Sequence, residues 1–133
     1  MIPIAALIAG VLVLFLVKHL FINNSYEKVL LNVALEINND CPVMIDEDTR
    51  LDSAKVQHQT LKYYYTMVKV LKDSIDVQSL KENLEPVILQ SVKTNPELKL
   101  YRDNKVTMIY HYSDKAGAII MEIEITPYKY KNE

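Results

Sequence analysis

The residues best suited to chemistry lie in one acidic segment around a single arginine. Residues 46–52 read DEDTRLD, with four acids flanking Arg50. Asp46 and Asp48 are spaced like the first two ligands of a calcium loop, but the arginine replaces the third oxygen ligand and a leucine replaces the turn glycine. We therefore expect these acids to cap backbone N–H groups and to pair with the arginine. Recognition of a partner is the alternative.

Tyrosines form the second candidate site. Residues 63–65 are three consecutive tyrosines within a predicted strand, which places aromatic side chains on both faces of the sheet. Packing under a helix with the hydroxyls in water is the common role of such residues, and a surface for stacking a ligand is the alternative. The candidate binding residues are Asp46, Asp48, Arg50, Asp52, Tyr63 and Tyr65.

The sequence carries no catalytic signature. A nucleophile pair of Cys41 and His111 can be drawn, but nothing around the cysteine indicates an activated thiol. The chain has only two glycines, which excludes a glycine-rich phosphate loop, and it has no HExxH or CxxC metal motif. We expect no catalytic residues, no metal and no cofactor.

Length and charge restrict the remaining function classes. The chain has 133 residues, with 15 Lys+Arg against 17 Asp+Glu and a net charge of −2. Because no basic run stands out, nucleic-acid binding is not expected. The composition is 50% hydrophobic, which is typical of a folded protein. The single cysteine cannot form an intramolecular disulfide and indicates no compartment.

An apolar stretch near the N-terminus predicts a membrane anchor. Residues 2–17 carry no charge, and the apolar run resumes after Lys18 and His19 through Ile22. About 20 helical residues are needed to cross the hydrocarbon core. A cleaved signal peptide is the alternative, but its basic n-region and small-residue cleavage site are missing. We predict a transmembrane helix over residues 1–22 that contacts the membrane through residues 2–22.

The remaining residues, 23–133, predict a single α+β domain. Helical spacing and the strand and turn patterns define seven elements. The helices are expected over residues 25–38 and 76–94, and the strands over 43–45, 53–56, 61–70, 106–112 and 118–127. Pro86 should kink or split the second helix. We expect an antiparallel sheet of four to five strands with two helices packed on one face.

The acidic segment resembles a sequence found in small bacterial proteins, membrane-anchored or exported, of no assigned function. Residues 41–53, CPVMIDEDTRLDS, carry the P-M-I-D-x-D-T-R-L-D-like pattern. Residues 61–68, LKYYYTMV, and 92–96, VKTNP, are similar to theirs as well. The resemblance implies a shared α+β domain and a bacterial envelope setting, with no activity to carry over.

Three functions remain open. The favoured one is a membrane-tethered, non-enzymatic interaction domain with an unidentified protein partner, in a single-pass protein of the bacterial inner membrane whose soluble side is undetermined. It requires Arg50 and Asp52 to be exposed beside an apolar patch or an open sheet edge. A small-ligand or ion-binding domain instead requires a concave pocket into which at least two members of one set converge, namely Tyr63, Tyr65, Tyr110, Tyr112 and Arg50. A hydrolase or thiol enzyme is the least favoured function.

Overall fold

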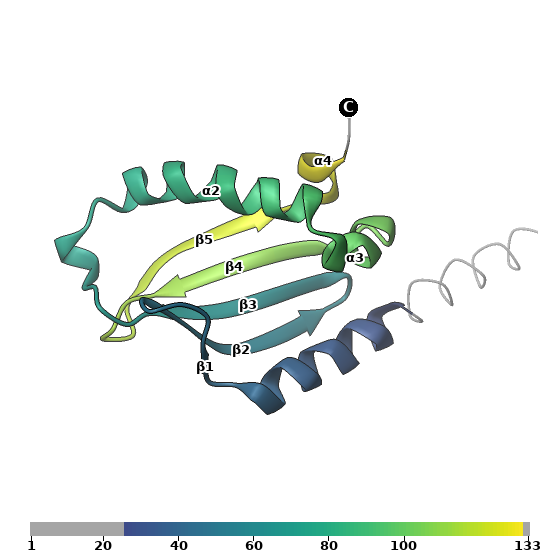
Figure 1. The fold of residues 1–133 in the computed structure, drawn as a ribbon, viewed down its shortest axis with the longest axis horizontal. Helices are drawn as coiled ribbons and strands as arrows, with labels where there is room; N and C mark the ends of the chain where they lie inside the picture. Colours follow the sequence, from purple (N-terminus) through teal and green to yellow (C-terminus); the bar gives the residue numbers. More distant parts are fainter. Residues whose placement is uncertain (1–25, 132–133) are drawn as a thin grey trace, which may run out of the picture.

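The structure, a computed structural model, describes residues 26–131 and contains one five-stranded sheet with helices packed against it (Figure 1). The strands are β1 (Val43–Met44), β2 (Thr49–Gln57), β3 (Thr60–Met67), β4 (Thr107–Ser113) and β5 (Ile119–Ile125). Besides a helix over residues 26–40, the helices are α2 (Val77–Thr94), α3 (Lys99–Asp103) and α4 (Pro127–Tyr130), with single 3₁₀ turns at Lys72–Ser74 and Pro96–Leu98.

The sheet is mixed, because its strands β3 and β4 run parallel. The strand order is β1-β2-β3-β4-β5, and each of the other neighbouring pairs is antiparallel. The prediction of an antiparallel sheet is therefore wrong. Parallel neighbours need a crossover connection of a dozen or more residues. The chain between β3 and β4 supplies this crossover through α2 and α3.

The predicted transmembrane helix over residues 1–22 lies outside the described residues. Within residues 26–131, no helix is both long and apolar enough to cross a bilayer. The transmembrane part of the fold prediction therefore finds no support among the described residues.

Pro86 does not split the second helix, since α2 runs through it without a break. Asp76 caps the start of the helix, where its side chain accepts a hydrogen bond from the N–H of Ser79 at 3.1 Å. Pro86 lies on the exposed side of α2. There, water can bond to the carbonyl group that loses its intrahelical donor. Solvent exposure is thus the reason why this proline is tolerated.

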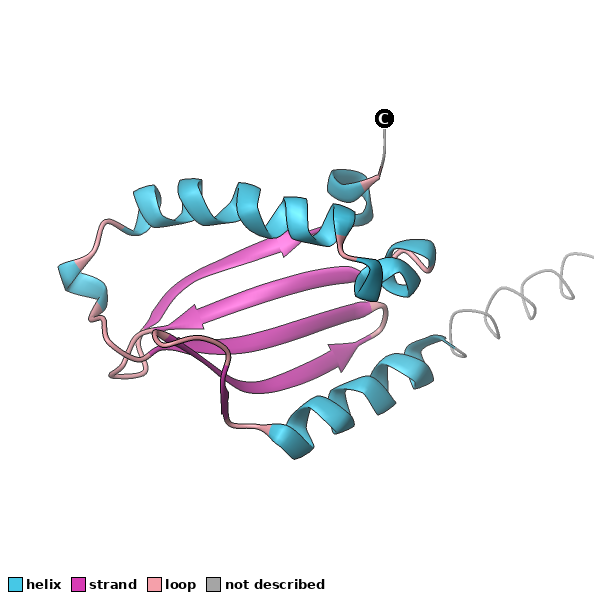
Figure 2. Cartoon of the chain, viewed as in Figure 1, coloured by secondary structure: helices cyan, strands magenta, loops and turns pink. Residues whose placement is uncertain are grey.

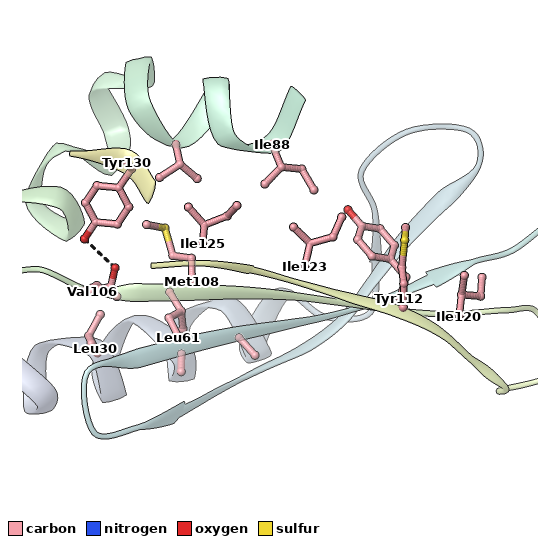
Figure 3. Close-up of a cluster of buried hydrophobic side chains, with 14 residues drawn as sticks. Leu30, Leu61, Ile88, Val106, Met108, Tyr112, Ile120, Ile123, Ile125 and Tyr130 are labelled. Atoms are coloured by element: carbon pink, nitrogen blue, oxygen red, sulfur yellow. Dashed lines mark hydrogen bonds between the residues drawn. The ribbon is translucent and has the colours of Figure 1, made fainter. Parts of the chain in front are cut away.

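One face of the sheet is buried against the helices. Alternate side chains of β3, β4 and β5 form a single apolar cluster with residues of α2 and of the helix over residues 26–40 (Figure 3). Its largest fully buried members are Leu30, Leu61, Val92, Val106, Met108, Ile123 and Ile125. At one end, the hydroxyl of Tyr130 donates to the carbonyl of Val106 at 2.8 Å and ties α4 to the start of β4 (Figure 3).

A buried carboxylate joins the β4–β5 loop to the crossover. Asp114 is only 3% exposed and accepts a hydrogen bond from the N–H of Lys72 at 2.9 Å. It also accepts the N–H groups of Ala116 and Ala118, each at 2.9 Å. These backbone donors, that of Lys72 first, lower the pKa of the Asp114 carboxyl. The loop is thereby held in place, with Gly117 at a φ of 88° that favours glycine.

Beyond its short pairing with β1, the edge of β2 is closed by a side chain rather than by a strand. The carboxamide of Asn38 donates to the carbonyl of Ala54 at 2.9 Å and accepts the N–H of Ala54 at 2.8 Å. It therefore takes the place of a neighbouring strand at this point of the edge. These two bonds fasten the helix over residues 26–40 along β2.

Replacement of Asn38 is expected to weaken this attachment. Asn38→Ala should lower the free energy of unfolding by about 1–3 kcal/mol, because it strands the N–H of Ala54, a residue only 2% exposed. Asn39→Ala is the matched control, since Asn39 is exposed and its loss should stay within about 0.5 kcal/mol. Urea unfolding of both variants measures the difference. Equal effects would contradict the role assigned to Asn38.

Candidate functional site

The acids of the predicted site do not converge on one point. A carboxylate oxygen of Asp46 accepts the N–H groups of Asp48 and Thr49 at 2.7 and 2.8 Å, so this residue caps its own turn. Asp48 is exposed and pairs with Lys69 across 3.0 Å. Among the described residues, no group of three or more His, Cys, Asp or Glu side chains is arranged to hold a metal ion. The first half of the acidic segment therefore shapes a turn.

Arg50 and Asp52 form an ion pair on the outer face of the sheet, away from the helices. The Nε of Arg50 lies 2.6 Å from Asp52, and their side chains are 41% and 32% exposed. A bulge at residues 51–53 of β2 is the reason why both side chains share a face. Asp52 also accepts the hydroxyl of Thr66. Beside Arg50 in the neighbouring strand is the half-exposed Met44.

Four tyrosines of β3 and β4 form a stacked row on the inner face of the sheet. This tyrosine row consists of Tyr63, Tyr65, Tyr110 and Tyr112. Parallel pairing aligns Tyr63 with Tyr110 and Tyr65 with Tyr112. The ring centroids of these two pairs are 5.3 and 5.1 Å apart, within the range of favourable aromatic contacts. Their strands lie between β5, along which α2 runs, and β2, along which the helix over residues 26–40 runs (Figure 2).

The hydroxyl groups of the tyrosine row have no hydrogen-bond partner among the described residues, yet none of them is fully enclosed. Tyr63, Tyr65 and Tyr110 are partly exposed, so these hydroxyls reach solvent. Burial of the rings raises the pKa of every member, to about 12 for Tyr110 and Tyr112. At neutral pH the row therefore presents protonated hydroxyl groups, which can donate hydrogen bonds to a bound molecule.

The outer face of the sheet carries a charged network. The carboxylate of Glu122 in β5 lies 2.6 Å from the Nζ of Lys62 and 2.7 Å from the Nδ1 of His111. These two partners, Lys62 first, lower the pKa of the Glu122 carboxyl. The ring of Tyr64 lies among these residues, with its centroid 5.0 Å from both the Lys62 ammonium and the His111 ring. The three consecutive tyrosines thus divide between an apolar inner face and a charged outer face.

The structure gives no support to a thiol nucleophile at Cys41. Burial, followed by the charges of Asp40 and Asp52, raises the pKa of the Cys41 thiol, which disfavours the reactive thiolate. The ring of His111 instead contacts Glu122 and Ser113.

The structure separates the predicted site residues onto two faces. Tyr63 and Tyr65 lie together in the row on the inner face, whereas Arg50 and Asp52 lie on the outer face. Arg50 therefore does not join the tyrosines at one place. The ligand-binding alternative named Tyr110 and Tyr112, but the list of candidate binding residues left them out. Only the alignment of β3 with β4 brings them to the first pair.

Residues 24–121 match the family described as a domain of unknown function, DUF8479. The chain belongs to this family. The match covers the acidic segment and all four members of the tyrosine row. No curated protein matches the sequence.

Solved structures share the fold at low sequence identity. A candidate secreted protein from Pseudomonas aeruginosa is 15% identical, with a TM-score of 0.70 over 83% of this chain and 96% of that chain. The pilotin EpsS of the Vibrio vulnificus type 2 secretion system is 9% identical, with a TM-score of 0.66 over 84% of this chain and 97% of that chain. The type II secretion pilotin AspS from Vibrio cholerae is 11% identical, with a TM-score of 0.64 over the same two shares.

The predicted location finds no support among these neighbours. They are a candidate secreted protein and two pilotins of secretion systems, and none is described as a single-pass protein of the inner membrane. The single-pass inner-membrane placement is therefore not supported and is not retained. At these identities the likeness establishes the fold alone.

The Arg50–Asp52 pair should contribute little to stability by itself. We expect Arg50→Ala to lower the free energy of unfolding by less than about 1 kcal/mol, because a partly exposed ion pair is lost. Asp52→Ala should cost about 1–3 kcal/mol, since the hydroxyl of the buried Thr66 also loses its acceptor. Chemical denaturation of the two variants tests this order, and a larger cost for Arg50→Ala would contradict it.

The tyrosine row also predicts how stability depends on alkaline pH. The unfolded-state pKa of tyrosine is 10.0, and the folded-state values of Tyr110 and Tyr112 are about 12. Stability from these groups is therefore fully present below pH 10 and is lost as the pH rises from 10 to about 12. Tyrosinate absorbance and circular dichroism, followed together, should show unfolding in this window. Ionisation of every tyrosine near pH 10 in a folded chain would contradict the burial of the row.

Proposed function

We propose that this chain is a non-enzymatic domain of the bacterial envelope that binds a protein partner through the tyrosine row. The observation that carries the proposal is a row of four stacked tyrosines whose hydroxyls find no partner among the described residues. Tyrosines with an apolar ring and an accessible hydroxyl are enriched at protein interfaces, where the hydroxyl bonds to the partner. A second protein that covers the row would complete these hydrogen bonds.

The chemistry of the row indicates what the partner presents. Rings in contact with one another offer apolar area at a small cost in side-chain entropy, which is typical of residues that dominate protein interfaces. The hydroxyls remain donors because burial raises their pKa values. The partner segment therefore supplies apolar side chains to the rings, and carbonyl or carboxylate oxygens to the hydroxyls.

The shared fold supports an envelope setting. The neighbours in structure are two pilotins of type II secretion systems and a candidate secreted protein, all from bacteria. An interaction role for this chain is consistent with these neighbours. It is also consistent with the site residues, because the acids take part in separate contacts and His111 contacts Glu122 rather than Cys41. The bacterial envelope setting that the acidic segment implies agrees with these neighbours.

Removal of single hydroxyl groups tests the proposal with little disturbance of the fold. The full-length double variant Tyr63→Phe, Tyr110→Phe keeps both rings, so its free energy of unfolding should stay within about 0.5 kcal/mol of the native value. Capture of a partner from envelope fractions should fall about tenfold, because two hydrogen bonds to the partner are lost.

Tyr64→Phe is the matched control, because Tyr64 lies in the same strand but on the outer face. It should capture the same partner as the native chain, as identified by mass spectrometry. If the double variant captures that partner as well as the control does, the tyrosine row is not the binding surface. A photo-crosslinking residue at position 65 should join the partner, and one at position 64 should not.

A further inference from the structure

The outer face of the sheet contains a hollow that the proposed function does not use. It has a volume of about 560 Å³ and lies at the end of the sheet where β2 turns into β3. Its lining consists of Lys55, Val56, Gln57, His58, Thr60, Lys62, Tyr64 and Ile109. This size falls within the range of about 300–1,000 Å³ found for small-molecule sites. No acidic residue belongs to the lining, although the chain as a whole is acidic.

Two lysines of the lining lie side by side on neighbouring strands. Lys55 of β2 is the register partner of Lys62 of β3. Like charges at directly opposed positions destabilise an antiparallel pair. Lys62 is compensated by Glu122 at 2.6 Å, whereas Lys55 has no carboxylate partner among the described residues. Folding therefore leaves one ammonium group here without a counter-charge.

Both ammonium groups lie near the aromatic ring of Tyr64. The Nζ atoms of Lys55 and Lys62 lie 5.4 and 5.0 Å from the centroid of the ring. A ring face attracts cations but does not neutralise them. Two positively charged groups therefore approach the same ring in the lining of one hollow.

The turn at the rim of the hollow adds further donors. His58 has a φ of 55°, as the first residue of the two-residue turn between β2 and β3. The hydroxyl-bearing Thr60 follows two residues later, and both line the hollow. The imidazole of His58 and the hydroxyl of Thr60 can therefore donate hydrogen bonds to a bound anion.

We propose that this hollow binds a phosphate ester, with the phosphate group between Lys55 and Lys62 and the organic part against Tyr64 and Ile109. A phosphate offers several acceptor oxygens and can contact both ammonium groups at once. The apolar side chain of Ile109, in register with Lys62 on the adjacent strand, supplies the floor for the organic part. The ligand is either a soluble phosphate ester or an anionic lipid headgroup, which share this chemistry.

Binding of glycerol phosphate to the full-length chain, measured by calorimetry, tests the site. Lys55→Gln should weaken binding about tenfold, because the uncompensated ammonium group is removed. Lys55→Arg keeps the charge and should retain binding. Lys81→Gln is the matched control: it removes the same charge from an exposed position on α2, remote in sequence from the lining, and should bind like the native chain.

Vesicles separate the two sources of the ligand. If the chain attaches more strongly to phosphatidylglycerol vesicles than to phosphatidylcholine vesicles, and this difference is lost in Lys55→Gln but kept in Lys81→Gln, the site binds a lipid headgroup. Binding of glycerol phosphate with no such difference between vesicles assigns it to a soluble ester. Equal weakening by Lys55→Gln and Lys81→Gln would reduce the effect to net charge and overturn the proposal. If the chain binds neither glycerol phosphate nor the vesicles, the proposal is also overturned.

Discussion

Parallel pairing of β3 with β4 is the constraint on which the rest of the domain depends. It forces the intervening chain to return across the length of the sheet, and α2 and α3 are the segments that make this return. The returning helix buries the inner face near β5, and the helix over residues 26–40 is fastened to β2 at the other side. The same pairing aligns the tyrosines of the two strands, since a shift of one residue would send them to opposite faces.

The strict alternation of side chains along β3 gives the domain two chemically distinct surfaces. Tyr63 and Tyr65 join an apolar row, while Tyr64 between them lies among Lys55, Lys62 and His111. Because these surfaces face opposite directions, a protein bound at the tyrosine row leaves the charged hollow accessible. A tether or ligand on one face and a partner on the other can therefore act together without competing for contacts.

The acidic segment owes its distinct sequence to local geometry more than to a site. Asp46 closes the turn before β2, and the bulge at residues 51–53 turns Asp52 toward Arg50 and Thr66. Asp46 satisfies backbone donors of the turn, and Asp52 satisfies the side chains of Arg50 and Thr66, which is how polar residues stabilise turns and bulges.

The sequence by itself determined the local elements: the helix over residues 76–94, the approximate ranges of the five strands, and a capping role for the acids that Asp46 fulfils. These elements depend on hydrogen bonds and periodicities among residues close in sequence, which the order of the residues reveals. Only the tertiary structure decided that β3 and β4 are parallel, that Tyr110 and Tyr112 extend the tyrosine row, and that Lys55 opposes Lys62. For β3 and β4, the pairing joins residues more than 40 positions apart, and register over such separations is set by packing of the whole core rather than by any local pattern.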